Sequence, residues 1–262
     1  MNAAPILARK DKNREGEVTQ TVPTHRQSSA VPTAGSNPVL LALDPSFTAT
    51  GWAVVDLVTE RVVALGVIAT RPRPTAQRRD VTAALMDGER GLRIRRELLA
   101  VLRTYRPIVV AQEASSGSQS AKAAAALARA QQACLDAIDE HLDALPLFVT
   151  PQAAKKRAVG RLNATKDEIE AAMRTRWSRT TTVVHPGLGH TVADGADLEA
   201  LLREPLPSGE RARPVGEWEN AWDALAIAHA AWDAPAVGAA RRMAQVAATE
   251  RATRGVVEGR VA

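Results

Sequence analysis

The stretch VLLALDPSFTATGWAVVD, residues 39–56, decides the fold. An apolar run ends in Asp44, turns at Pro45 and resumes after Gly51, a pattern typical of two short strands joined by a tight turn. A third β-rich run, RVVALGVIAT, covers residues 61–70. The three runs predict an antiparallel meander, with the carboxylate of Asp44 at the end of a buried strand.

Beyond the meander, apolar periodicity predicts helices alternating with strands. The expected elements are a helix at 92–105, a strand at 108–113, a helix at 121–142, a strand at 145–150, and helices at 164–177 and 218–232. This order predicts an α/β fold with a mixed five-stranded sheet, three strands antiparallel and two parallel, flanked by helices.

The chain divides into one folded domain and two extensions. Residues 1–37 are polar and lack hydrophobic periodicity, so we expect a disordered N-terminal extension. The domain is expected at 38–234, with an insertion rich in Gly, Pro and charge at 178–218. Residues 235–262 are expected to be a basic C-terminal tail that can form a helix.

Charge and composition restrict the function classes. Of the formal net charge of +5, residues 1–37 carry +2 and residues 238–262 carry +3, so the remainder is neutral. Attraction to DNA in the domain must therefore come from local placement of basic side chains. The single cysteine, Cys134, excludes a disulfide within the chain or a zinc cluster of cysteines. No apolar run is long enough to span a membrane, and no signal-type segment opens the chain, so a cytoplasmic protein is expected.

Three carboxylates each interrupt an apolar segment: Asp44 and Glu113 end strands, and Asp223 lies in the helix AWDALAIAHAAW. Taken alone, each is better explained as an N-cap, a turn residue or an arginine partner. If the two strands are adjacent and parallel, however, Asp44 and Glu113 emerge at the same sheet edge, where Asp223 could face them. Grouped carboxylates need a counter-ion, and a pair of Mg²⁺ ions would satisfy them and support phosphodiester hydrolysis.

Four blocks of sequence resemble the RuvC-type Holliday-junction resolvases, which have the RNase H-like fold. LLALDPSFTATGWAVV is similar to the family's opening, although Ser46 stands where the family has Gly. IVVAQEASSGSQSAKAAAALARAQ is similar to the second block, PQAAKKRAVGRLNATKDEIEAAM to the third and NAWDALAIAHAA to the fourth. The resemblance covers about residues 39–177 and 218–233.

The resemblance implies a Mg²⁺-dependent endonuclease, bacterial or phage-encoded and acting at the nucleoid, that nicks four-way DNA junctions in recombination or repair and leaves 5′-phosphate ends. It implies two metal ions, for which Mn²⁺ can substitute, and a homodimer. It makes Asp44, Glu113 and Asp223 catalytic metal ligands, and places Lys155 and Lys166, eleven positions apart, near the scissile phosphate. DNA-binding side chains implied by the same blocks are Lys155, Lys156, Arg157, Lys166, Ser116 and Lys122.

Two departures from the family pattern leave alternatives open. Asn220 stands where the family has a fourth acidic or histidine ligand, so either its amide oxygen or the neighbouring Glu219 would complete the metal site. The stretch ASSGSQS after Glu113 lacks the aromatic residue that some members stack on bases. The alternatives are a less selective phage or mobile-element nuclease acting on forks or branched replicating DNA, and a catalytically inactive junction-binding module.

Overall fold

The sheet begins with three antiparallel strands, as the opening stretch predicts. The computed structural model describes residues 38–70, 82–115, 120–177 and 219–258. β1 (Val39–Asp44) pairs with β2 (Ala49–Asp56), and β2 pairs with β3 (Val62–Ala69). The carboxylate of Asp56 accepts hydrogen bonds from the backbone N–H groups of Val58 and Thr59, which fixes the β2–β3 turn.

Two parallel strands complete the sheet on the other side of β1. β4 (Val109–Glu113) pairs with β1, and β5 (Leu147–Val149) pairs with β4, which gives the order β3-β2-β1-β4-β5. The predicted fold class, a mixed five-stranded sheet with three antiparallel and two parallel strands flanked by helices, is confirmed. β1 lies at the centre and is hydrogen-bonded along both edges.

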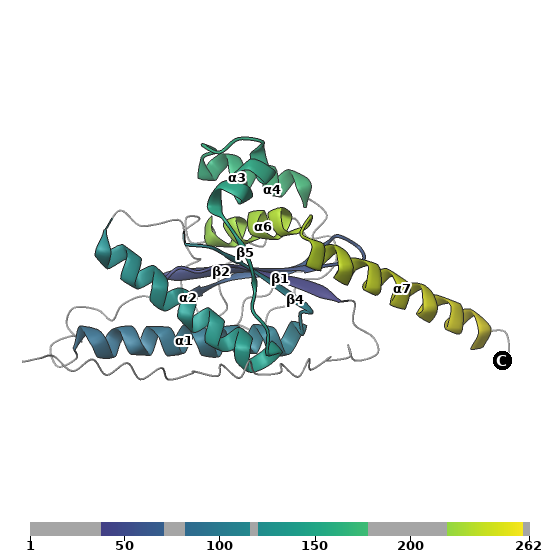
Figure 1. The fold of residues 1–262 in the computed structure, drawn as a ribbon, viewed down its shortest axis with the longest axis horizontal. Coiled ribbons are helices and arrows are strands. Elements are labelled where there is room, and N and C mark those ends of the chain that lie inside the picture. The colour runs from purple at the N-terminus through teal and green to yellow at the C-terminus, as the bar shows by residue number, and fades with distance from the viewer. Residues whose placement is uncertain (1–37, 71–81, 116–119, 178–218, 259–262) are drawn as a thin grey trace, which may run out of the picture.

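Helices cover both faces of the sheet (Figure 1). α1 (Ala83–Tyr105) and α2 (Ala121–Leu142) pack on one face, against Leu41, Leu43 and their neighbours. α6 (Glu219–Ala231) packs on the other face, against Leu40 and Ala42. The alternation of side chains along β1 therefore feeds two separate hydrophobic cores, one on each side of the sheet.

α1 is longer than the sequence predicts. It begins at Ala83 rather than near residue 92, with Thr82 as the N-cap. Gly88 and Gly91 weaken the helical pattern in this first part. The structure supplies tertiary support instead, because Asp87 forms an ion pair with Arg129 of α2 at 2.5 Å.

A helix absent from the predicted order lies between β5 and the next expected helix. α3 (Pro151–Val159) is short, and α4 (Lys166–Arg176) follows it after a turn. The local signals are present, since Thr150 caps the N-terminus, Pro151 opens the helix and Gly160 ends it at a φ of 85°. Both helices stack on the outer side of α6 (Figure 1).

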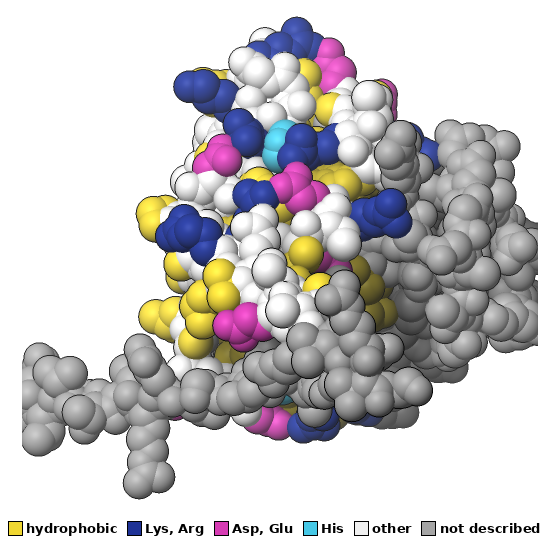
Figure 2. Space-filling view, turned by 90° about the vertical axis from the view of Figure 1, so that its right-hand side faces the viewer, with side chains coloured by type: hydrophobic (Ala, Val, Ile, Leu, Met, Phe, Trp, Pro, Cys, Tyr) yellow, Lys and Arg dark blue, Asp and Glu magenta, His cyan; other side chains and the backbone are white. Residues whose placement is uncertain are grey.

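The last described element, α7 (Pro235–Glu258), starts on the core and then leaves it. Val237, Ala240 and Ala244 are buried, whereas Met243 and Val246 are exposed. Figure 1 shows the helix leading away from the sheet. Seen from that side in Figure 2, most basic side chains lie over the upper part of the described surface with acidic ones between them, and hydrophobic side chains prevail lower down. None of the described helices has the length and apolarity that a membrane span requires.

Candidate active site

Asp44 and Glu113 stand side by side because of the sheet register. β1 and β4 are parallel neighbours, and Leu43 lies opposite Gln112, so the next residue of each strand is a carboxylate. Side chains alternate along a strand, which places Asp44 and Glu113 on the same face as Ala42 and Ala111, the face that α6 covers. Asp44 is only 8% exposed.

α6 comes unusually close to the sheet at the same end. Gly51 of β2 pairs with Asp44, and a Cβ built on Gly51 would lie 1.9 Å from the backbone oxygen of Asn220. The side-chain amide of Asn220 donates a hydrogen bond to the backbone oxygen of Ala49, which ties the first turn of α6 to β2. One helical turn further on, Asp223 is therefore held over the ends of β1 and β4.

The three carboxylates act on one another electrostatically. Burial raises the pKa of Asp44 well above its usual value, and a hydrogen bond to Glu113 and the charges of Glu113 and Asp223 raise it further. Burial also raises the pKa of Asp223 to about 6, with the charges of Glu113 and Glu219 adding to the effect while Lys166 and Lys155 oppose it. Asp44, Glu113 and Asp223 thus belong to one electrostatic cluster.

Lys166 supplies positive charge to this cluster. Its ammonium forms an ion pair with Glu219 and lies 4.0 Å from a carboxylate oxygen of Asp223. Its charge lowers the pKa of both Asp44 and Asp223, against the dominant effect of burial. Lys155, half-buried on α3, acts in the same direction on Asp223. Both lysines predicted to lie near the reacting phosphate therefore lie beside the carboxylates.

The donor chemistry of the cluster suits a hard divalent cation. Every acidic group in it offers oxygen, the ligand atom that Mg²⁺ prefers, and burial raises the pKa of Asp44 and Asp223, so that a nearby cation would stabilise their charged forms. Across the described residues, no three His, Cys, Asp or Glu side chains are already arranged to hold a metal ion. The carboxylates are instead engaged with one another and with Lys166.

Comparisons with known proteins decide the family. The sequence profile described as "Crossover junction endodeoxyribonuclease RuvC" matches residues 40–187. The crossover junction endodeoxyribonuclease RuvC of Rhodospirillum rubrum is 30% identical over 168 residues, which make up 62% of this chain and 85% of that relative. The chain belongs to the RuvC family. Membership in this family makes the chain an endonuclease. The matched range contains Asp44, Glu113, Lys155 and Lys166, whereas Asp223 lies beyond it and is brought to the cluster by α6.

Two solved structures of resolvases are also similar to this RuvC-family chain. Thermus thermophilus RuvC in complex with Holliday junction substrate is 24% identical, with a TM-score of 0.49, and the match covers 74% of this chain and 92% of that one. The yeast mitochondrial Holliday junction resolvase Ydc2 is 12% identical, with a TM-score of 0.47, and the match covers 80% and 84%.

The other side chains that the resemblance implied for DNA binding lie on α2 and α3 or outside the described residues of this RuvC-family chain. Lys156 and Arg157 follow Lys155 on α3, where both are exposed and Arg157 forms an ion pair with Asp233 at 2.9 Å. Lys122 is exposed in the first turn of α2. Ser116 lies outside the described residues.

Sequence reasoning missed Gln131, which holds the end of β4. Its side-chain amide donates a hydrogen bond to the backbone oxygen of Glu113 at 3.1 Å, and its own oxygen accepts one from the hydroxyl of Ser115 at 2.5 Å. The one signal in the sequence is a pair of glutamines, Gln131 and Gln132, inside an Ala-rich helix. Only the structure separates them, because Gln132 bonds to Asp136 on the surface of the same helix.

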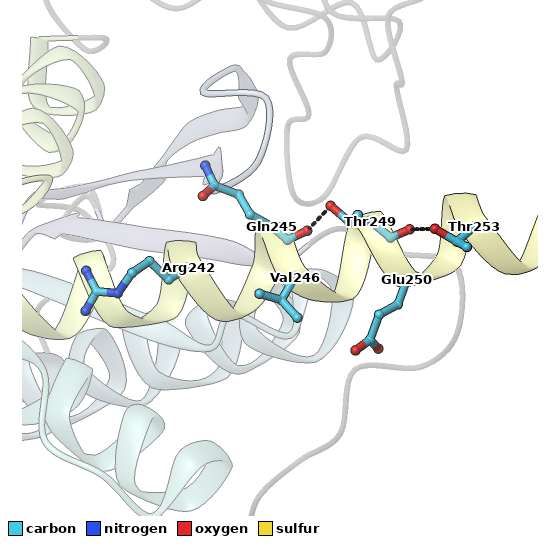
Figure 3. A pocket seen from close by; sticks show the side chains of 6 residues that line it. All are labelled: Arg242, Gln245, Val246, Thr249, Glu250 and Thr253. Atoms are coloured by element: carbon cyan, nitrogen blue, oxygen red, sulfur yellow. Dashed lines mark hydrogen bonds between the residues drawn. The ribbon is translucent and has the colours of Figure 1, made fainter.

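A pocket on α7 lies away from the carboxylate cluster of this RuvC-family chain. Arg241 of α7 pairs with Glu60, which lies in the β2–β3 turn, at the opposite end of β2 from Gly51. Figure 3 shows two threonine hydroxyls of the pocket bonded to backbone oxygens of α7 itself. All the lining residues come from this one helix: Arg242, Gln245, Val246, Thr249, Glu250 and Thr253.

Proposed function

We propose that this RuvC-family protein nicks four-way DNA junctions by metal-dependent hydrolysis of phosphodiester bonds, with Asp44, Glu113 and Asp223 as the metal ligands. The observation that carries the proposal is the convergence of these three carboxylates, from β1, β4 and α6, into one cluster whose members shift one another's pKa. Buried carboxylates without full compensation cost stability, and a divalent cation is the usual reason for tolerating them.

Each side chain has a distinct task in this mechanism. Bound divalent ions, two Mg²⁺ by preference, would activate a water and stabilise the leaving oxygen. Asp44, Glu113 and Asp223 would hold these ions through their carboxylate oxygens. Glu219 or the amide oxygen of Asn220 would add a further ligand. Lys155 and Lys166 would neutralise charge on the phosphate as the nucleophile approaches.

The test uses a synthetic four-way junction with one labelled strand and 5 to 10 mM Mg²⁺ as a typical working range. Wild-type protein should release nicked strands with 5′-phosphate ends, and EDTA should stop the reaction. Asp44→Asn and Asp223→Asn should each slow cleavage by about 100-fold or more, because a transition-state electrostatic contact of this kind is lost. Asp139→Asn makes the same chemical change on the exposed side of α2 and should cleave at the wild-type rate.

The proposal is wrong if Asp44→Asn and Asp223→Asn cleave as fast as the wild type. It is also wrong in its simplest form if the wild-type protein binds the junction in EDTA and produces no nick with any divalent metal. That second outcome would identify a junction-binding module without activity.

A second candidate function is a less selective nuclease for forks and other branched DNA. It is favoured by residues 114–120, ASSGSQS, which offer no aromatic ring to stack on a base at a junction. Nicking of a junction, a fork and a linear duplex of equal length should be compared at one salt concentration, since charge contacts depend on salt. Equal rates on all three substrates would replace the junction assignment with the broader one.

A homodimer is also proposed, because a four-way junction offers two symmetric strands to be cut. Leu85 and Leu92 support it, since they are 56% and 66% exposed and lie two turns apart on α1, an apolar surface suited to a second copy. Sedimentation equilibrium should give twice the mass of the chain, and Leu92→Lys should shift the distribution toward the monomer. A purely monomeric wild type at micromolar concentration would contradict the dimer.

A further inference from the structure

We propose that Lys166 exchanges partners during metal loading: its ammonium neutralises Glu219 and Asp223 before the metal binds, and the incoming divalent ion displaces it toward the DNA phosphate. The inference rests on the proposed function, since it takes these carboxylates to be the metal ligands. It adds a property of Lys166 that is measurable without DNA, namely competition with the metal for the same oxygens.

The position of Lys166 suits such a movement. It is the first residue of α4, and the preceding Thr165 forms a capping box with Glu168, so the backbone at this point is firmly held. The side chain itself is 61% exposed and reaches across to α6. A fixed base and a long, mobile side chain allow the ammonium to move by several ångströms without any change in the fold.

The charge of Lys166 does not stabilise its own helix, α4. A positive charge in the first turn faces the positive end of the helix dipole, where an acidic residue would be more stable. Asp167 and Glu168, the next two residues, follow that preference. The compensating interactions of Lys166 are therefore those with α6: the ion pair with Glu219 and the approach of 4.0 Å to Asp223.

The charge of Lys166 acts on the whole cluster. It opposes the rise in pKa of Asp223 more strongly than Lys155 does, and it also acts on the buried Asp44. A divalent ion bound to Asp44 and Asp223 would occupy the same electrostatic position and would repel the ammonium. The two cations therefore compete, and each can bind fully only when the other has left.

Competition between Lys166 and the metal distinguishes two possible roles of this lysine: binding the DNA phosphate alone, or also occupying the metal's position before the metal binds. A lysine that binds the DNA phosphate and lies away from the metal ligands has no effect on metal affinity in the absence of DNA. A lysine that also holds the place of the metal weakens metal binding, so its removal should strengthen metal binding even though it slows cleavage. The two effects of a single substitution should thus have opposite signs.

The experiment measures Mn²⁺ binding to the full-length protein without DNA, by the loss of the free Mn²⁺ signal in electron paramagnetic resonance at neutral pH. Lys166→Met should lower the dissociation constant about three- to tenfold, the range expected for losing one ion pair and one nearby charge. Lys166→Arg keeps the charge and should stay close to the wild type. Arg242→Met removes the same charge from the exposed side of α7 and should also leave Mn²⁺ binding unchanged.

Each outcome has a defined meaning. If Lys166→Met binds Mn²⁺ no more tightly than the wild type, while Asp44→Asn abolishes binding in both backgrounds, the exchange of partners is wrong and the metal site stands. If neither the wild type nor Lys166→Met binds Mn²⁺ in a manner that depends on Asp44, the metal site of the proposed function fails, and the exchange fails with it. Tighter binding by Lys166→Met together with slower junction cleavage supports both.

Discussion

Gly51 is the position where one added methyl group should lower both the stability and the activity of the protein. A Cβ at this position would lie 1.9 Å from the oxygen and 2.2 Å from the carbon of the Asn220 backbone, and 2.9 Å from the nitrogen of Ala221. Non-bonded carbon and oxygen atoms settle at about 3.5 Å or more. In Gly51→Ala, β2 and α6 would therefore have to move apart by roughly 1.5 Å.

The size of the effect follows from the nature of the obstacle. Overpacked sites usually cost about 1–3 kcal/mol, and the upper end applies here because the blocking atoms are backbone and cannot change rotamer. The movement also carries Asp223 away from Asp44 and Glu113, since Asp223 is carried by α6 while the other two belong to the sheet. A misplacement of about 1 Å at a reacting centre can slow catalysis by about 100-fold.

The assay pairs urea unfolding with junction cleavage for the wild type, Gly51→Ala and Gly88→Ala. A Cβ at Gly88 meets no atom within 4 Å, and this residue lies inside α1, so the control should gain about 0.5–1 kcal/mol from helix propensity. Gly51→Ala should lose about 3 kcal/mol by the overpacking estimate and most of its cleavage rate. An unchanged unfolding midpoint together with full activity would refute the close seating of α6 on β2.

Three further predictions concern single side chains. Gln131→Ala should lower the cleavage rate by about 10–100-fold and raise the Mg²⁺ concentration required, because Gln131 orients the backbone of Glu113. The control Gln132→Ala should leave the rate and the Mg²⁺ requirement unchanged. Equal effects of the two substitutions would exclude the positioning role of Gln131. Asp44→Asn removes a buried charge beside Glu113, so it should raise the thermal midpoint of the metal-free protein while abolishing cleavage. A lower midpoint would contradict the repulsion between Asp44 and Glu113. Burial, with Arg176 and Arg157, lowers the pKa of His229 from 6.5 to about 4, against the opposing charge of Asp233. The unfolded chain therefore takes up the proton first as the pH falls from 6.5 to 4, and the folded protein should lose about 1–2 kcal/mol of stability once solvent screening is allowed for. Chemical unfolding of His229→Gln across this pH range should lack that loss.

The sequence could predict the two carboxylates of the sheet from local pattern alone. Asp44 and Glu113 each end an apolar strand, and the two-residue period of a strand is enough to place them on one face once the strands are parallel neighbours. Asp223 was harder, because α6 is apolar nearly all round and its rotation about its own axis cannot be deduced from periodicity. For that residue the family resemblance supplied what the pattern could not.

Other features depend on approaches in space that no local pattern records. The seating of α6 on Gly51 involves residues about 170 positions apart, and the bond from Gln131 to Glu113 joins a helix to a strand end. The missed helix α3 is a different case, since its nine residues are too few to display a clear helical period. Its capping signals, Thr150, Pro151 and Gly160, were sufficient to identify it.

The central position of β1 in the sheet has a consequence for how this nuclease unfolds on heating. Because β1 is hydrogen-bonded to β2 on one edge and to β4 on the other, its amides should be among the slowest in the protein to exchange with deuterium. Asp44, a metal ligand in the proposed mechanism, thus lies at the end of the segment that should open last. On gentle heating, the position of Asp44 should therefore persist until the whole domain melts, so an earlier loss of activity would come from the helices that carry Asp223 and the two lysines.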